Sequence, residues 1–172
     1  MQTLKLLAAI ALAVLVHFAG AWLFPGWFVR VVDVFVVVIA LYALRGNSLA
    51  GLLVGLLIGL LRDSLARGPF GLFGFAGTIV GYVTARLAQR LVIQRPTGVL
   101  AVVSFASVLQ QAVVVGLSFL LLPAVEVPSP LWIAIQAGAC GVLGMAVYVV
   151  AGHWRRTAED RRRGRMSRLR LG

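Results

Sequence analysis

The sequence predicts an all-α protein, a polytopic bundle of transmembrane helices, from three compositional observations. Of its 172 residues, 61% are hydrophobic and only 12% are charged, with a mean hydropathy of +1.00. Soluble domains carry roughly a quarter charged residues, about twice this share. Disordered chains have low hydrophobicity, so that class is excluded too. One cysteine, Cys140, and two histidines, His17 and His153, exclude a disulfide or zinc scaffold.

Six apolar segments are candidate spans, because a spanning helix needs about 20 mostly apolar residues. They cover about 4–24, 31–44, 48–61, 71–92, 98–122 and 131–152, and form one transmembrane domain over 1–152. The third is short and closes at Arg62-Asp63, so it is either a full span in a thinned bilayer or partly re-entrant. We favour the full span.

The first segment also has features of a signal peptide. Lys5 is a charged flank, and Ala19-Gly20-Ala21 resembles a small-residue cleavage site. The apolar run nevertheless continues through Trp22-Leu23-Phe24, with Trp22 and Trp27 typical of interfacial anchors. An uncleaved helix is therefore the favoured interpretation.

Half of the sixteen basic residues but only two of the five acids lie in a tail over 153–172, so the basic charge is concentrated in the tail, which contributes +6 of the net +11. A basic tail beside a membrane segment favours the cytoplasmic side over nucleic-acid binding. With six spans and this tail inside, the inner segments hold thirteen basic residues and the outer segments three, which places both termini in the cytoplasm. The tail is either an amphipathic surface helix or disordered. Its arginines are expected to meet anionic lipid or a cytoplasmic partner, foremost Arg155, Arg156, Arg161, Arg162 and Arg163.

Glycines recur at helical spacing in three segments, and this spacing lets helix backbones approach closely. The third segment carries Gly51, Gly55 and Gly59, called here the third-segment glycine face. The fourth carries Gly74, Gly77 and Gly81, and the sixth carries Gly138, Gly141 and Gly144. Each face either packs within the bundle or docks a partner's membrane helix. Internal packing is favoured for any one face.

Two acids lie at the predicted outer ends of spans. Asp33 follows Arg30 by three residues, and Asp63 follows Arg62 directly. Ionisable residues within a membrane are functional candidates, but at the interface their cost is small. Each acid is therefore expected to be peripheral and structural, either pairing with its neighbouring arginine or capping a helix end.

The remaining polar residues predict no enzyme, no metal site and no cofactor. No two carboxylates share a helix face, no His, Cys and acid cluster suits a metal, and no serine has a basic partner at suitable spacing. Gln110 and Gln111 are deeper and are expected to hydrogen-bond a neighbouring helix, while His17 is expected to pack at a helix interface.

The stretch over 51–87 combines several features. A glycine-rich third segment ends in Gly-x-x-x-Asp, here Gly59 and Asp63. A small-residue loop with Phe70-Gly71 follows, and the next helix runs into a basic inside loop. This stretch resembles the rod shape-determining protein MreD family, whose length, six-span topology and basic C-terminus are similar. The long Arg-rich tail departs from the family pattern.

The resemblance implies a non-enzymatic membrane scaffold of the bacterial rod complex, or elongasome, in the inner membrane. The family acts with MreC, the MreB filament, RodA and a class B penicillin-binding protein in lateral peptidoglycan synthesis. Its bundle is similar to the substrate-binding subunit of energy-coupling-factor transporters. We expect the outer side, around Asp33, Asp63 and Gly71, to position the membrane helix of MreC, with the third-segment glycine face giving close contact.

The alternative is a substrate-binding membrane subunit of a vitamin-type transporter. That function needs converging polar groups in an otherwise apolar cavity, and Arg62, Asp63 and Gln110 are the plausible set. A lipid-modifying enzyme is a third and weaker possibility, because the chain lacks catalytic groups.

Overall fold

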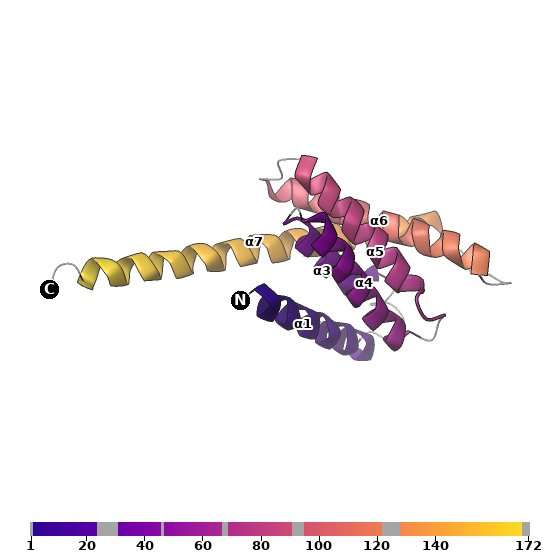
Figure 1. Cartoon of the computed structure of the whole chain (residues 1–172), viewed down its shortest axis with the longest axis horizontal. Coiled ribbons are helices and arrows are strands. Elements are labelled where there is room, and N and C mark those ends of the chain that lie inside the picture. Colours follow the sequence, from indigo (N-terminus) through magenta and orange to yellow (C-terminus); the bar gives the residue numbers. More distant parts are fainter. Residues whose placement is uncertain are drawn as a thin grey trace.

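All regular secondary structure in the described part of the chain is α-helix. The computed structural model describes residues 2–23, 31–45, 47–66, 69–90, 95–121 and 128–169, with side chains between Leu6 and Trp154. Six helices and no strand occur in these ranges (Figure 1). They are α1 (Gln2–Leu23), α3 (Val34–Ala43), α4 (Ser48–Leu65), α5 (Leu72–Arg90), α6 (Pro96–Leu121) and α7 (Pro130–Leu169). The all-α fold class is confirmed.

Local signals explain where these helices begin. The side chains of Asp33 and Asn47 accept hydrogen bonds from the backbone N–H groups of Val36 and Ala50, which caps α3 and α4. Helices α6 and α7 begin with proline, which suits a first helical position because its missing N–H has no partner there anyway.

Among the helices that the structure describes, four are long and apolar enough to cross a membrane, namely α1, α4, α6 and the first part of α7. The chain is therefore a multi-pass membrane protein by helix length and composition. Helix α4 does not stop at Leu61 as predicted but continues through Arg62 and Asp63 to Leu65. Its 18 residues suffice for a span. Helix α3 has only 10 residues and is too short to span by itself. In α5, the glycines and a polar last turn lower the mean hydropathy.

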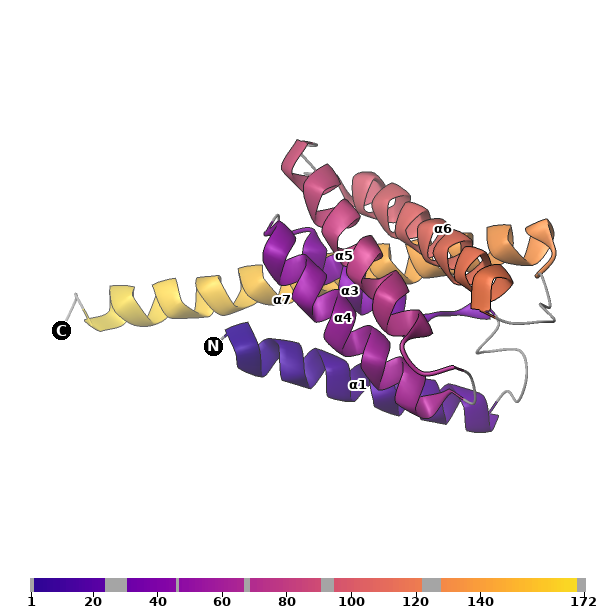
Figure 2. The ribbon, with the colours of Figure 1, turned by 45° about the vertical axis from the view of Figure 1, so that its right-hand side comes forward.

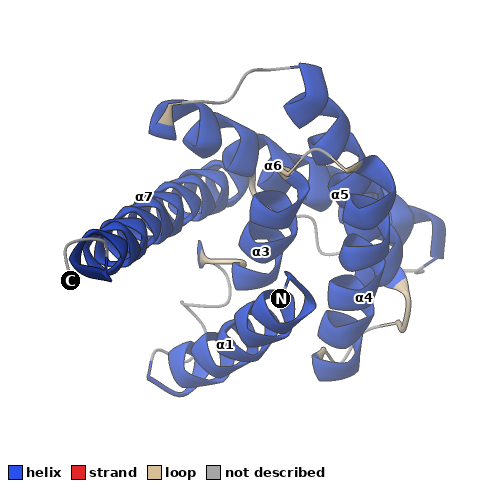
Figure 3. Ribbon diagram, turned by 60° about the vertical axis from the view of Figure 1, so that its left-hand side comes forward, coloured by secondary structure: helices blue, strands red, loops and turns tan. Residues whose placement is uncertain are grey.

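Helix α3 lies at the centre of the bundle. Its sequence is almost entirely apolar, and seven of its ten residues are buried. A helix that is apolar all round belongs in a core. It contacts α1, α4, α5, α6 and α7, and Figure 3 shows it enclosed by the other helices. The core cluster is built around its Phe35, Val36 and Ile39.

Helices α4 and α5 form the most extensive helix pair, joined as an antiparallel hairpin (Figure 2). The third-segment glycine face meets the glycines of α5. A Cβ added to Gly51 would lie 2.6 Å from the carbonyl oxygen of Gly81. A Cβ on Gly55 would clash with the carbonyl oxygen of Gly77, and one on Gly59 with that of Phe73. The two backbones are therefore in direct contact along the whole hairpin.

Helix α7 has 40 residues and does not end near Gly152 as predicted. At about 1.5 Å per residue it is about 60 Å long, twice the thickness of a bilayer's hydrocarbon core. Its C-terminal part projects well beyond the other helices (Figure 1). The basic tail thus continues the helix as far as Leu169, and the arginines predicted to meet lipid lie on this extension, outside the described side chains.

Candidate functional site

A buried polar cluster forms where α3 begins. Asp33 is only 5% exposed, and it accepts hydrogen bonds from three groups. The backbone N–H of Val36 donates to Oδ1 at 3.4 Å, Gln110 Nε2 donates to Oδ2 at 3.1 Å, and Arg62 forms an ion pair with Oδ2. The backbone N–H of Asp33 also points to Cys140 Sγ at 3.3 Å. One residue therefore joins α3, α4, α6 and α7.

The cluster lies inside the bundle because α3 is only half the length of a span. Ten residues cover about 15 Å, half the thickness of a hydrocarbon core, and Asp33 stands directly before the first of them. Gln110, its partner, is near the middle of α6. A helix N-terminus in an apolar interior has N–H groups without helical partners and a partial positive charge. The Asp33 carboxylate accepts a hydrogen bond from one of these N–H groups, and its negative charge balances the partial positive charge.

Asp63 caps a different helix. Its Oδ1 accepts from the backbone N–H of Phe73 at 3.0 Å and its Oδ2 from that of Gly74 at 2.8 Å, so it caps α5 from the end of α4. Asp63 is 4% exposed. The guanidinium of Arg62 lies 3.8 Å from the centroid of the Phe73 ring, which places the Asp33 and Asp63 sites side by side. We call this assembly the Asp33–Asp63 cluster: Asp33, Arg62, Asp63, Phe73 and Gln110.

The expectation that Asp33 and Asp63 are peripheral is wrong. The structure also shows which of them caps a helix and which pairs with an arginine. Neither acid is peripheral; both are buried. Asp63 caps a helix and does not pair with Arg62, while Asp33 does both, capping α3 and pairing with Arg62 across two helices. Arg30, the expected partner of Asp33, lies outside the described residues.

The glutamines bear out their expected role. Gln110 binds Asp33, and Gln111 donates to Gln136, which ties α6 to α7. Near that contact Ser104 donates to the carbonyl oxygen of Ala137 at 2.9 Å. Within the described residues, Gln110 Oε1 is buried without a hydrogen-bond partner, since its Nε2 faces the carboxylate. His17 packs against Phe35 with ring centroids 5.2 Å apart, as expected for an interface residue.

Sequence reasoning missed Cys140 and Phe73 as members of this region. The sequence gives no indication that Cys140 belongs to a polar site, because a single cysteine on the apolar face of a helix resembles any small core residue. In the described ranges, no group of three or more His, Cys, Asp or Glu residues could hold a metal ion.

No family model matches this chain, and no curated protein or solved structure is similar to it.

Gly71 has a backbone conformation that favours glycine. It precedes α5 with a φ of +99°, and an added Cβ would meet nothing within 4 Å. Its carbonyl accepts from the N–H of Phe75 at 2.9 Å, which starts the helix. Position 71 therefore requires glycine because of its left-handed backbone conformation, which residues with a Cβ disfavour. A lack of space for a side chain is not the reason.

We expect Gly71→Ala to lower the free energy of unfolding by about 1–2 kcal/mol, the cost of a left-handed backbone for a residue with a Cβ. Gly71→Asn should cost less, because asparagine tolerates this conformation better. The measurement is the melting temperature of the two purified variants beside that of the parent. Equal losses from both variants would contradict the conformational explanation.

Proposed function

We propose that the chain is a six-span, non-enzymatic scaffold of the bacterial inner membrane, similar to the MreD component of the rod complex. It binds MreC and thereby supports RodA and its class B penicillin-binding protein. In this proposal α3, with the residues before it, and α5 complete the six spans, and both termini are cytoplasmic. The arginines on the extension of α7 face anionic lipid or the MreB filament.

The residues that carry the resemblance act together, and this supports the proposal. The stretch over 51–87 coincides with the α4–α5 hairpin, whose glycines allow backbone contact. Asp63, the acid of the Gly-x-x-x-Asp motif, caps α5 across the turn of that hairpin. The motif thus has one physical reason, close contact of α4 with α5 and a cap on the start of α5.

The partner surface proposed from the sequence needs a correction. The third-segment glycine face cannot receive a helix of MreC, because α5 of the same chain already covers it. Gly74, Gly77 and Gly81 lie on the other side of that same contact. Asp33 and Asp63 are likewise used inside the bundle and are too buried to touch a partner directly.

The outer turn of the hairpin is the surface that fits a partner, and it carries the proposal. Phe70 is 72% exposed, and it stands directly before the conformationally fixed Gly71. Asp63 fixes the start of α5 just beyond. A large exposed aromatic side chain beside a capped helix start is the type of residue that anchors a protein interface. We infer that Phe70 contacts MreC at the periplasmic surface of the inner membrane.

The test is a comparison of Phe70→Ala with Phe119→Ala. Phe119, on α6, is similarly exposed at 62% and lies outside the proposed surface. The tagged parent and both variants are purified from detergent-solubilised membranes, and co-purified MreC is quantified by mass spectrometry. We expect Phe70→Ala to reduce recovered MreC by about tenfold or more, as for an interface anchor worth about 1.4 kcal/mol or more.

The same experiment separates the scaffold from the transporter alternative. Recovery of MreC, RodA and a penicillin-binding protein with the parent supports the scaffold, whereas recovery of an ATPase pair with a coupling subunit would overturn it. Equal recovery of MreC with both variants would exclude the outer turn as the contact. The polar set suggested for a vitamin site is already engaged, since Arg62 and Gln110 bind Asp33 while Asp63 caps α5.

A further inference from the structure

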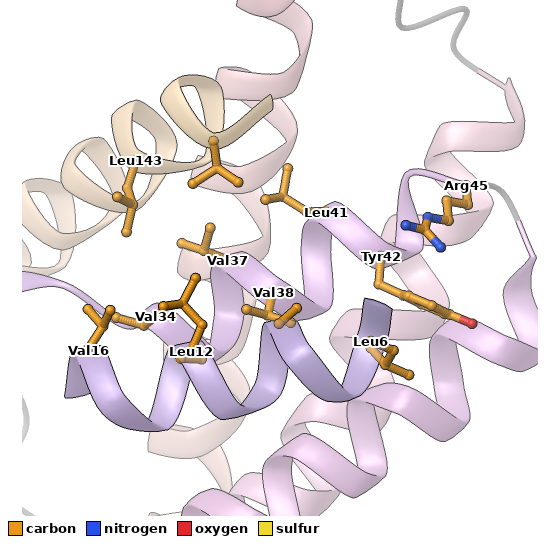
Figure 4. Close-up of a pocket in the computed structure, with 13 residues that line it drawn as sticks. Leu6, Leu12, Val16, Val34, Val37, Val38, Leu41, Tyr42, Arg45 and Leu143 are labelled. Atoms are coloured by element: carbon orange, nitrogen blue, oxygen red, sulfur yellow. The ribbon is translucent and has the colours of Figure 1, made fainter. Parts of the chain in front are cut away.

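An apolar groove lies between α1, α3 and α7, on the opposite side of α3 from the glycine hairpin. Its cavity volume is about 240 Å³. Of its thirteen lining residues, eleven are Leu, Val or Ala, and the other two are Tyr42 and Arg45. The groove exists because α1 packs mainly on α3, while α3 also contacts α7, so a channel between α1 and α7 stays open (Figure 4).

The two polar residues lie together at one end of the groove. Figure 4 shows Tyr42 and Arg45 at the end where α1 begins, near Leu6, whereas Val16 and Val34 mark the other end. The Arg45 guanidinium carbon is 5.2 Å from the centre of the Tyr42 ring, and the Arg45 side chain is exposed. Among the described residues no carboxylate pairs with it, since the ion pair they contain joins Arg62 and Asp33.

The length of the groove matches one leaflet. From Leu6 to Val16 along α1, ten residues rise about 15 Å, which is half of a hydrocarbon core about 30 Å thick. The charged end therefore falls at the headgroup level when the apolar part lies in the hydrocarbon.

We propose that this groove binds one anionic phospholipid, with an acyl chain along α1 and α3 and the phosphate at Arg45. Charge complementarity at a single end and apolar walls along the rest are what such a lipid requires. The site is separate from the proposed partner surface at Phe70 and does not depend on it.

The affinity of the delipidated, full-length protein for single lipids tests this, measured by native mass spectrometry in mild detergent. The probes are dioleoyl phosphatidylglycerol and dioleoyl phosphatidylethanolamine, which share their chains and differ in charge. We expect one phosphatidylglycerol to bind about fivefold more tightly, since one arginine near an anionic headgroup contributes about 1 kcal/mol. Arg45→Gln should remove this preference.

Two matched controls are available in the chain. Arg86 also lies over a tyrosine, Tyr82, at 5.7 Å, but away from the groove, so Arg86→Gln should keep the preference. Ala9 lines the groove while its neighbour Ala8 is exposed and does not. Ala9→Phe should weaken binding of both lipids at least fivefold, and Ala8→Phe should leave it unchanged.

Several results would overturn the proposal. Equal effects of Arg45→Gln and Arg86→Gln would mean unspecific attraction to the basic surface, and competition by millimolar glycerol phosphate would mean a phosphate site without a chain. Should Ala9→Phe fail to fold, the exposed Arg45 variant and its control still decide the headgroup site. A photo-crosslinking residue at position 9 should capture a lipid in native membranes, and capture of a polypeptide instead would reassign the groove to a partner.

Discussion

Gly55→Leu is expected to abolish the folded protein. The Cβ of any larger residue at position 55 clashes with the carbonyl oxygen of Gly77, and the next atoms it meets are also backbone, the carbonyl carbon of Gly77 and the N–H of Thr78. Backbone cannot change rotamer, so α4 and α5 would have to separate. Because this hairpin is the most extensive helix contact in the bundle, we expect a loss above the usual overpacking range of about 1–3 kcal/mol.

Gly138→Leu is the matched control. Gly138 is also a glycine within an apolar helix, but an added Cβ there meets nothing within 4 Å. Relief of glycine's poor helix propensity should make this variant neutral or more stable by up to about 1 kcal/mol. Both variants are followed by the fraction of protein that stays monodisperse on size exclusion after heating. A similar melting profile for the two would refute the close contact of α4 and α5.

The glycine pattern shows what the sequence can and cannot predict. Spacing of four residues in Gly51, Gly55 and Gly59 predicts a close helix contact, and the structure contains it. Spacing says nothing of which helix lies opposite. The α5 glycines are less regular, at 74, 77 and 81, so their register with the third-segment glycine face emerges only when the hairpin is built.

Helix boundaries were missed for a related reason. The hydropathy of 31–44 predicts a span but not that α3 begins inside the bundle, directly after Asp33. A polar residue ends an apolar run in the sequence, whether it lies in water or is buried with partners. The same ambiguity affects Arg62 and Asp63, which would end a span only if they lacked partners. With Asp33 and the N–H groups of Phe73 and Gly74 to bind, they extend α4.

The continuation of α7 has a different origin. Pattern reasoning ends a membrane helix where charge begins, but nothing in 153–169 breaks a helix. Arginine, alanine, glutamate, leucine and methionine are good helix formers, there is no proline, and the weaker formers Thr157, Asp160 and Gly164 are isolated. The change at Gly152 is therefore a change of surroundings and not of secondary structure.

The Asp33–Asp63 cluster gives each buried charge a structural partner. The Asp33 carboxylate holds the start of α3 against α4 and α6, and Asp63 holds the start of α5. Because both acids are satisfied within the chain, the cluster fixes the positions of helices and, through α5, the outer turn at Phe70. A function that depends on that turn therefore depends indirectly on the buried ion pair.

In the ion pair between Arg62 and Asp33, loss of the arginine should lower the free energy of unfolding more than loss of the aspartate charge. Arg62→Met keeps the apolar stem but leaves the Asp33 carboxylate buried with only Gln110 and the Val36 N–H, so we expect a loss of about 3–5 kcal/mol. Asp33→Asn should cost less, because asparagine still caps α3 and the partly exposed Arg62 can extend its charge toward water. Arg86→Met, which removes an arginine without a carboxylate partner in the described residues, should be nearly neutral.

The double variant Asp33→Asn with Arg62→Met provides the decisive comparison. It removes both charges and keeps the cap, so its melting temperature should lie above that of Arg62→Met alone, although a second residue has been changed. Neighbours in one network are not additive, and an interaction energy of this sign is the signature of an unpaired buried charge in the single variant. If the double variant is instead as unstable as the sum of the single losses, the ion pair contributes little. In that case Arg62 acts mainly through its stacking on Phe73, since that contact is lost equally with and without the Asp33 carboxylate.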